Sequence, residues 1–553
     1  MMLKNYLLVL TALIMINKNH SQSQSNFYGS FESNGIYYQE NEQENYANEF
    51  ASNNYLNLKY LFNSSWNFEA QIESYSPMRL QGYSDSFEKT HLSTLSINYK
   101  KNGFGLTFGS IYEQFGSGLA LRTWEDRQLG INNSIWGIRS TFENKNINLK
   151  LIGGWQKKGS QISVGKVIGL DSEIIVFNSS EIYQNLMLGF SYVGRFENLA
   201  FPDIFPPVGY EFNDLTSLFS ARIDYVKNDF YFGYEQILKS EDGVTQFGLI
   251  LNDFVKKGSA HIMNLGVAKS GFGFDFTFRR LENMGFFGDR FEQGELFGET
   301  TINYLPALTK QHDYLLTNIN IYESQPYVSF PDPSLMKAGE IGFQIDLYYD
   351  IKKGSVFGGK YGSNLSLNFS SWYNLDGEYS YNPLDYNSDF LAFGQKYFSE
   401  QSVELRKKWS ENFSNIFLFV NKFYNKRYIE EKFGEVNSQI IVVDNTIKLK
   451  NKRSLRFELQ HLFNKDDNKN WYGYGLEYNF NYNFSAYYNN IVNYQNIEDD
   501  KPSYYSFGTS YTKNSSRFSL SYGKQRGGLL CYGGICRYVP EFKGLSFSIN
   551  TSF

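Results

Sequence analysis

Apolar and polar side chains alternate along most of this chain, and the alternation limits the folds that it can adopt. In residues 471–484, WYGYGLEYNFNYNF, each even position carries Tyr, Leu or Phe, and the odd positions from Gly473 onward carry Gly, Glu or Asn. Residues 271–279, GFGFDFTFR, repeat the pattern with Phe274 on one face and Asp275 on the other. Successive side chains of a β-strand point to opposite faces, so the pattern predicts strands with one apolar and one polar face.

Three further features distinguish a membrane barrel from a soluble β-sandwich or a large secreted β-protein, which would also alternate. Turn signals such as Lys-Asn-Gly at 101–103 separate strands of about ten residues, the length that crosses a bilayer at a tilt. Tyrosine pairs such as Tyr504-Tyr505 lie near predicted strand ends, as in the interfacial girdles of outer-membrane barrels. The chain ends on an alternating segment, GLSFSINTSF, whose last residue is Phe553.

Together these features predict an all-β fold. We expect a single large transmembrane antiparallel β-barrel of about 24 strands, within a range of roughly 20 to 26, with long loop inserts. Closure of the barrel would satisfy every backbone hydrogen bond in lipid, and a polar lumen would account for the polar face of each strand. Phe274 and Tyr474 should then face lipid, while Asp275 and Glu477 should face the interior.

The first residues are typical of an export signal. Residues 1–23, MMLKNYLLVLTALIMINKNHSQS, place Lys4 before an apolar stretch and end on a polar region that contains Ser21 and Ser23. This order predicts a secretory signal peptide at 1–23, followed by the barrel at 24–553; the alternative is a short buried helix. We therefore expect the protein in the cell outer membrane.

The terminal aromatic residue predicts how the barrel reaches the membrane. Phe553 on an alternating last strand resembles the recognition signal of outer-membrane barrels, so we predict that it is the assembly signal. The expected partners are outer-membrane lipid, the barrel-assembly machinery during insertion, and other envelope proteins.

Composition excludes several other classes. Two cysteines leave no room for a multi-cysteine zinc or iron-sulfur site, and a net charge of -5 gives no basic footprint for nucleic acid. No interior segment approaches the roughly 18 consecutive apolar residues of a membrane helix. His261 and His461 continue the apolar face of their segments, which favours a position near a membrane interface over a catalytic role. We predict no catalytic residue, no cofactor and no metal site.

Three stretches interrupt the alternation, at 197–215, 282–313 and 323–340. They contain prolines, which cannot donate to a strand ladder. We predict that the three stretches are loops, caps or inserts in the lumen.

The densest group of charges lies within residues 103–139, GFGLTFGSIYEQFGSGLALRTWEDRQLGINNSIWGIR. The glycines do not form a phosphate loop, because no Gly-Lys-Ser/Thr ending and no predicted helix follow them. The segment predicts a charge network in the lumen, and the alternative is an ordinary charged loop and hairpin. The residues of this predicted network are Glu113, Arg122, Glu125, Asp126, Arg127 and Arg139.

Both cysteines lie near the end of the chain, in RGGLLCYGGICRYVPEFKG. Cys531 and Cys536 flank a Gly-Gly turn, and two thiols in that position can form a disulfide in an oxidising compartment. A metal site would need further Cys or His ligands. We predict a hairpin disulfide.

Three blocks of the sequence carry a resemblance to a known family. They are YEQFGSGLALRTWEDRQLGINNSIWGIR, INYLPALTKQHDY at 302–314, and the ending CYGGICRYVPEFKGLSFSINTSF. The chain resembles an uncharacterised family of large outer-membrane β-barrel proteins of the Bacteroidota. The resemblance implies a barrel in the outer membrane and supplies no catalytic residues.

Two classes of function remain open after these considerations. The first is a non-catalytic structural or accessory subunit of an envelope assembly, secretion or uptake machine. The second is a passive or substrate-selective channel similar to a porin. An enzyme ranks third, because no nucleophile or base stands out in the sequence.

Overall fold

The computed structural model describes most of the chain, namely residues 26–41, 49–179, 183–198, 213–246, 249–292, 299–466, 469–496 and 501–553. The predicted signal peptide lies outside the described residues, as do residues 199–212 of the predicted insert at 197–215. Within the described part of the chain, no helix is long and apolar enough to cross a membrane.

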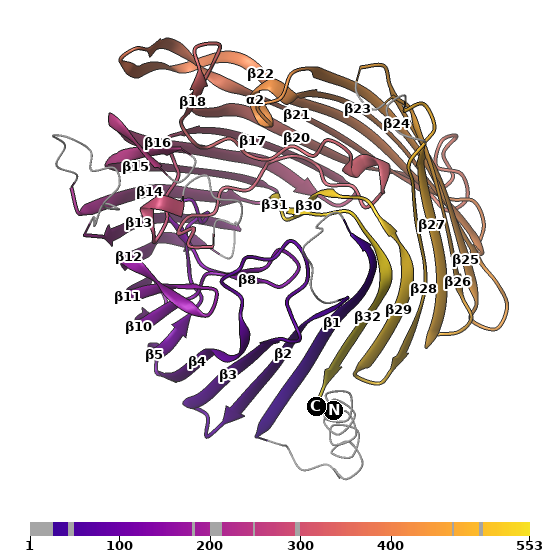
Figure 1. Ribbon diagram of the computed structural model, residues 1–553, viewed down its shortest axis with the longest axis horizontal. Coiled ribbons are helices and arrows are strands. Elements are labelled where there is room, and N and C mark those ends of the chain that lie inside the picture. The colour runs from indigo at the N-terminus through magenta and orange to yellow at the C-terminus, as the bar shows by residue number, and fades with distance from the viewer. Residues whose placement is uncertain are drawn as a thin grey trace.

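Twenty-four strands form one antiparallel sheet that closes into a barrel (Figure 1). The all-β barrel and its predicted strand number are therefore confirmed. In the first half of the ring the strands are β1 (Phe27–Asn41), β2 (Phe50–Leu61), β3 (Trp66–Tyr75), β4 (Lys89–Lys101), β5 (Phe104–Ile111), β10 (Ile135–Glu143), β11 (Ile147–Lys158), β12 (Gln161–Ser179), β13 (Gln184–Phe196), β14 (Leu215–Lys227), β15 (Phe230–Gln246), β16 (Leu249–Lys269) and β17 (Phe272–Glu282). In the second half they are β20 (Gly339–Ile351), β21 (Ser363–Tyr381), β22 (Leu384–Lys408), β23 (Phe413–Asn425), β24 (Glu435–Lys448), β25 (Ser454–Asn464), β26 (Trp471–Asn479), β27 (Phe484–Asn493), β28 (Ser503–Lys513), β29 (Ser516–Gln525) and β32 (Phe542–Ser552).

Each barrel strand pairs with the next barrel strand along the chain, and β32 pairs with β1 to close the ring. Ser30 of β1 lies opposite Ser552 of β32, so the first strand begins and the last strand ends at the same mouth of the barrel. The connections at this mouth are mostly short, such as 102–103, 228–229 and 514–515. We call it the turn mouth, and we call the opposite end the insert mouth.

Three long inserts all start from the insert mouth. Insert 1 (112–134, between β5 and β10) contains β6 (Gln114–Phe115), β7 (Leu121–Arg122), β8 (Glu125–Asp126) and β9 (Ile131–Asn132). Insert 2 (283–338, between β17 and β20) contains η1 (Arg290–Glu292), η2 (Leu316–Asn318), β18 (Ser329–Asp332) and β19 (Leu335–Lys337). Insert 3 (526–541, between β29 and β32) contains β30 (Gly528–Tyr532) and β31 (Ile535–Val539), and a short helix α2 (Lys426–Ile429) follows β23.

The predicted inserts at 282–313 and 323–340 are one insert, which corrects the sequence-based division. Residues 314–322, between them, alternate like a strand in sequence but lie inside the barrel. Tyr314, Leu316 and Ile319 are buried there against apolar side chains of the wall. The buried positions 314, 316, 317, 319 and 322 do not follow a period of two, so the alternation in the sequence does not reflect how this segment packs.

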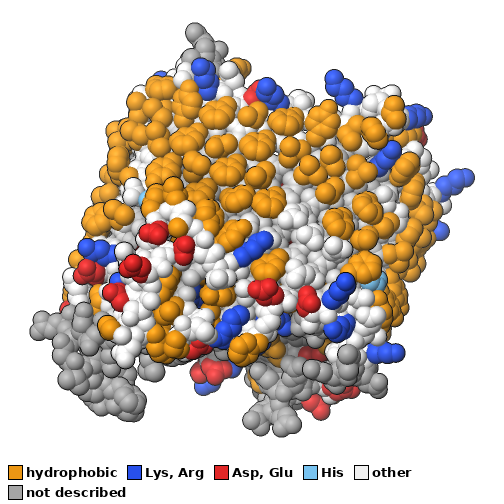
Figure 2. Space-filling model, turned by 90° about the horizontal axis from the view of Figure 1, so that it is seen from above, with side chains coloured by type: hydrophobic (Ala, Val, Ile, Leu, Met, Phe, Trp, Pro, Cys, Tyr) orange, Lys and Arg blue, Asp and Glu red, His pale blue; other side chains and the backbone are white. Residues whose placement is uncertain are grey.

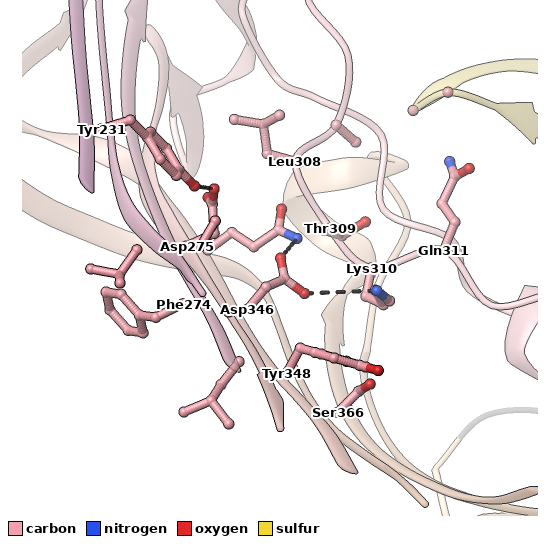
Figure 3. A pocket seen from close by; sticks show the side chains of 18 residues that line it. Tyr231, Phe274, Asp275, Leu308, Thr309, Lys310, Gln311, Asp346, Tyr348 and Ser366 are labelled. Carbon is pink, nitrogen blue, oxygen red and sulfur yellow. Dashed lines mark hydrogen bonds and ion pairs between the residues drawn. The ribbon is translucent and has the colours of Figure 1, made fainter. Parts of the chain in front are cut away.

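The two faces of the wall differ as the alternation predicts. On the outer face, large apolar side chains such as Phe219 and Leu459 are 56% and 55% exposed. Figure 2 shows hydrophobic side chains over a broad band of the outer wall, with most of the acidic side chains in view gathered along one edge of it. Phe274 points away from the lumen, whereas Asp275 contacts Tyr231 inside it (Figure 3).

The densest packing lies inside the barrel. Phe115 of insert 1 and Phe286 of insert 2 are almost fully buried and pack with inward aliphatic residues of the wall, among them Val193 and Leu218. A second cluster joins η2 to the inner face of β23–β27. The inserts therefore supply the core that the wall alone cannot form.

Glycines give room for aromatic rings at the seam between β1 and β32. Gly29 and Phe553 exchange two backbone hydrogen bonds, of 2.8 and 2.9 Å. A Cβ atom at Gly29 would lie 2.4 Å from the ring of Phe553, and one at Gly35 would lie 2.3 Å from the ring of Phe547. The seam thus depends on the absence of side chains at these two positions.

This geometry predicts that Gly35→Ala destabilises the closed barrel by about 1–3 kcal/mol, because the ring of Phe547 must move. Gly153→Ala is the control, since the nearest atom to its new Cβ would be Ile168 Cγ2 at 4.0 Å. Urea unfolding of both variants in detergent micelles measures the difference. Equal midpoints for the two variants would refute the role of the glycine.

Candidate functional site

The three inserts bond to one another inside the ring of strands. Tyr304 N–H donates to the carbonyl of Gly118 at 2.9 Å, which joins insert 2 to insert 1. Ala307 N–H donates to the carbonyl of Gly534 at 2.9 Å, which joins insert 2 to insert 3. Figure 1 shows β8, β30 and β31 within the circle of barrel strands. We call the described residues of the three inserts the plug.

Insert 1 attaches the plug to the strands that begin the barrel. The guanidinium of Arg127 forms ion pairs of 2.7 Å with Glu32 of β1 and with Glu125 of its own insert. Glu125 accepts a hydrogen bond of 2.7 Å from Gln71 of β3. The hydroxyl of Tyr83 donates to the backbone carbonyl of Arg127 at 2.7 Å. Insert 1 is therefore held in place by side chains of β1, of β3 and of the connection after β3.

A buried carboxylate attaches insert 2 to β13 and β15. Asp242 accepts hydrogen bonds from Arg195 at 2.7 Å and from Arg290 at 2.6 Å. The side chains of these three residues are at most 7% exposed. Burial and the nearby Arg195 lower the pKa of Arg290, and Asp242 opposes that shift. Because each charge would be costly without its partner, the trio is a strong constraint on where insert 2 lies.

Insert 2 continues along β17, β20 and β21. Arg279 donates to the carbonyl of Pro306 at 2.7 Å and to the carboxylate of Glu340 at 2.5 Å. Tyr322 donates to the same carboxylate. The indole of Trp372 donates to the carbonyl of Leu308 at 3.0 Å. The side chains of Arg279, Tyr322, Glu340 and Trp372 are buried, so these hydrogen bonds replace those that water would otherwise make.

The same insert reaches the opposite side of the barrel at η2. Leu316 N–H donates to the side-chain oxygen of Gln460 in β25 at 2.8 Å. Lys422 of β23 donates to the carbonyl of Thr317 at 3.0 Å, and His312 lies 3.2 Å from the carboxylate of Glu400 in β22. The plug therefore contacts the wall near β1–β3, along β13–β21 and again at β22–β25.

The six charged residues selected from sequence do not form one network. Arg139 and Lys150 both pair with Glu113 at 3.0 Å, and this group is separate from the pairs of Arg127 described above. Arg122 lies over the ring of Tyr304, 3.9 Å from its centroid. Asp126 accepts from the backbone N–H groups of residues 128 and 129 at 2.9 Å. Of the predicted set, Arg139 lies in the wall on β10 and the other five residues lie in insert 1, where they make separate contacts.

Sequence reasoning did not identify the buried trio of Arg195, Asp242 and Arg290. Its members are far apart in the chain, and the pairing depends on how insert 2 folds back. One signal was present, because Arg195 and Arg279 occupy inward positions next to buried apolar residues, where an isolated charge would be costly.

The structure contains a disulfide between Cys531 and Cys536, which are register partners in β30 and β31. Cys536 lines a cavity of about 390 Å³ where the three inserts meet, together with Trp124 and Tyr327. Glu323 also lines it; its side chain is accessible to solvent, yet the surrounding protein limits its hydration. The limited hydration raises the pKa of Glu323 to about 7, and the charge of Lys337 offsets part of the shift.

A second cavity, of about 640 Å³, lies between the plug and the inner wall of β15–β21 (Figure 3). Residues 307–311 of insert 2 form its plug side. Asp275 and Asp346 lie on its wall side, and Lys310 is 3.8 Å from Asp346. Polar residues on both sides make this cavity suitable for water and small ions. Among the described residues, no group of three His, Cys, Asp or Glu side chains is arranged to hold a metal ion.

The model of a family of unknown function, DUF6029, matches residues 2–553. The chain belongs to this family. No curated protein sequence matches the DUF6029 chain. Its predicted source among the Bacteroidota stays a prediction.

Several solved outer-membrane barrels are similar in structure to the DUF6029 chain. The siderophore receptor PirA from Pseudomonas aeruginosa is 8% identical with a TM-score of 0.41, over 96% of this chain and 81% of the receptor. A variant of the ferric enterobactin receptor PfeA from Pseudomonas aeruginosa is 10% identical with a TM-score of 0.43, over 96% and 81%. The P pilus usher PapC is 9% identical with a TM-score of 0.38, over 95% and 98%.

The buried trio generates a test of how firmly the plug is held. Asp242→Asn leaves the two buried guanidinium groups with Glu197, at 3.5 and 3.8 Å, as their remaining counter-charge, so we expect a loss of about 3 kcal/mol in the free energy of unfolding. Urea unfolding in detergent micelles measures this loss, and limited proteolysis shows whether insert 2 becomes accessible.

Glu241→Gln is the matched control for this test. Glu241 is the neighbouring carboxylate, with a side chain 62% exposed and a surface ion pair of 3.6 Å to Lys257. Its replacement should change stability by less than about 1 kcal/mol. Similar losses in both variants would contradict a special role for the buried carboxylate.

Proposed function

We propose that this chain is an outer-membrane barrel whose lumen is closed by its own plug. In this proposal the barrel is a non-catalytic structural or accessory subunit of an envelope assembly, secretion or uptake machine. The observation that carries the proposal is the set of buried contacts from the plug to the wall around most of the ring, among them the pairing of Asp242 with Arg195 and Arg290. A pore that conducts freely would not need buried contacts that hold inserts inside its lumen.

Location in a membrane is supported by the outer wall. Exposed apolar side chains on consecutive strands, such as Phe219 on β14 and Leu238 on β15, would be costly in water. The closed ring of backbone hydrogen bonds is the arrangement that lipid demands of strands. Because outer-membrane barrels have short periplasmic turns and longer extracellular loops, the turn mouth would face the periplasm. Phe553, at the seam, would be read by the barrel-assembly machinery.

One long hairpin at the insert mouth supports a role with partner proteins. Strands β21 and β22 extend past their neighbours (Figure 1). In the extended part of β22, Phe390 and Leu391 are 56% and 60% exposed. An exposed apolar hairpin above the membrane would offer a contact surface for another envelope protein.

The histidines support the absence of catalysis in this proposal. His312 lies against Glu400 at an attachment point of the plug. His261 and His461 lie near tyrosine hydroxyl groups, those of Tyr234 at 2.9 Å and Tyr494 at 3.0 Å. Each of these three histidines has a polar partner that accounts for its position without a catalytic role.

A substrate-selective channel is the second candidate. The cavity of about 640 Å³ beside residues 307–311 favours it, because Asp275 and Asp346 would attract cations into a wet space next to the plug. The two candidates differ in the current that the intact protein should carry.

Planar bilayers distinguish the closed barrel from the channel. We expect the purified intact protein to show little steady conductance, and replacement of residues 286–336 by a short Gly-Ser linker to give large, stable openings. The same linker in place of residues 465–470, a connection at the same mouth, is the control and should leave the pore closed. If the linker variant does not fold, Asp242→Asn should still raise the frequency of openings. Large, stable, ion-selective currents from the intact protein would favour the channel instead.

Location in lipid predicts different effects on the two faces of one strand. Phe274→Lys puts a charge on the lipid side and should cost roughly 2–4 kcal/mol near the bilayer midplane, whereas Asp275→Lys on the lumen side should cost less. Folding into phosphatidylcholine vesicles, followed by the heat-resistant compact form on gels, measures both. Equal losses in the two variants would reject the assignment of faces and the membrane location.

A further inference from the structure

Basic side chains gather on one part of the turn mouth. The connection 352–362 contributes Lys352, Lys353 and Lys360, and the end of β22 contributes Lys407 and Lys408. These segments are neighbours, because Ser363 at the start of β21 pairs with Lys407 of β22. Two adjacent turns therefore present five lysines together.

The next turn along the wall extends this group. Lys448 ends β24, and Lys450, Lys452 and Arg453 follow it. Strand β23 connects the two regions, since Lys408 pairs with Ser414 and Phe413 pairs with Ile447. We call residues 350–363, 407–413 and 448–454 the basic strip.

The basic strip differs sharply in charge from the rest of the chain. It holds these nine basic residues against two acidic ones, Asp350 and Glu411, whereas the whole chain has 52 basic and 57 acidic residues. In the described part of the protein, no carboxylate lies within ion-pair distance of any of the nine. Several kinds of anion could bind to such a surface, so charge alone does not identify the partner.

Apolar and aromatic side chains lie among the lysines, and they indicate which kind of anionic partner the strip binds. Val356 and Phe357 are 92% and 77% exposed, and Trp409 is 56% exposed. Lys407 Nζ lies 4.3 Å from the centroid of the Trp409 ring, and Lys408 Nζ lies 4.9 Å from that of Tyr361. Mixed lysine and aromatic side chains at the end of lipid-facing strands match the boundary between acyl chains and headgroups.

We propose that the basic strip binds the phosphate headgroups of anionic phospholipids in the leaflet that the turn mouth meets. The ammonium groups would neutralise lipid phosphates, while Val356, Phe357 and Trp409 would enter the upper acyl region. A free phosphate would satisfy the charges but not these apolar side chains. The inference rests on the proposed location in a membrane, and it adds a lipid class and a side of the bilayer.

Native mass spectrometry of the full-length protein tests the inference. The protein is released from mixed micelles that contain equal amounts of phosphatidylglycerol and phosphatidylethanolamine, and the ratio of the two lipids retained is measured. We expect a preference for phosphatidylglycerol of about fivefold or more in the wild type, falling to less than about twofold when Lys352, Lys353, Lys360, Lys407 and Lys408 are replaced by Gln.

The control variant carries the same change of charge at other turns of the same mouth. It replaces Lys100, Lys101, Lys227, Lys269 and Lys513 by Gln, and it should keep most of the preference. If the five-residue strip variant does not fold, the triple variant K352Q/K353Q/K360Q and the wild type in about 0.5 M NaCl should both show a weaker preference.

Three results would overturn the inference. They are no preference in the wild type, an equal loss in the strip and control variants, or displacement of phosphatidylglycerol by inorganic phosphate. Insertion of the wild type into phosphatidylcholine vesicles separates this failure from failure of the proposed function. Insertion without a preference rejects the basic strip alone, and no insertion into any vesicle rejects both.

Discussion

The structure depends on one constraint, which is that every backbone N–H and C=O group in the barrel wall must have a partner. An unpaired group in hydrocarbon costs several kcal/mol, so a sheet in a membrane must have no free edge. The pairing of β1 with β32 removes the last edge, and the glycines at positions 29 and 35 allow that pairing beside the rings of Phe553 and Phe547. Closure in turn sets the two faces of every strand.

A closed ring of 24 strands also creates an interior that side chains of the wall cannot fill. This chain fills much of it with three inserts that enter from one mouth and bond to each other. Buried charges hold the plug because leaving any of them unpaired would be costly, and Asp242 shows this most clearly with its two arginines. Backbone hydrogen bonds between strands thus close the wall, whereas the plug is joined within itself by backbone hydrogen bonds and held to the wall mainly by side-chain contacts.

The wall could be predicted from sequence, whereas the plug could be predicted only in part. Alternation is local, so it was sufficient to assign Phe274 and Asp275 to opposite faces and to estimate the strand number. The pairing of Arg290 with Asp242 joins residues 48 apart through a folded insert, and no local pattern encodes it. Residues 314–322 alternate in sequence but pack inside the barrel as part of insert 2, so the sequence suggested two inserts where there is one. The short strands of insert 1 likewise did not reveal its role, although Arg127 and Glu125, which form an ion pair there, belong to the predicted charge network.

Hydrogen exchange of the intact protein in lipid nanodiscs tests the central claim most directly, because the plug is defined by its backbone hydrogen bonds. The amides of Ile302, Tyr304 and Ala307 donate to carbonyl groups of residues 286, 118 and 534, respectively. If the inserts form one plug within the barrel, these amides should exchange at least about a hundredfold more slowly than an unstructured peptide of the same sequence. Exchange at the rate of the unstructured peptide in all three amides would show that the inserts do not close the lumen, and it would contradict the account.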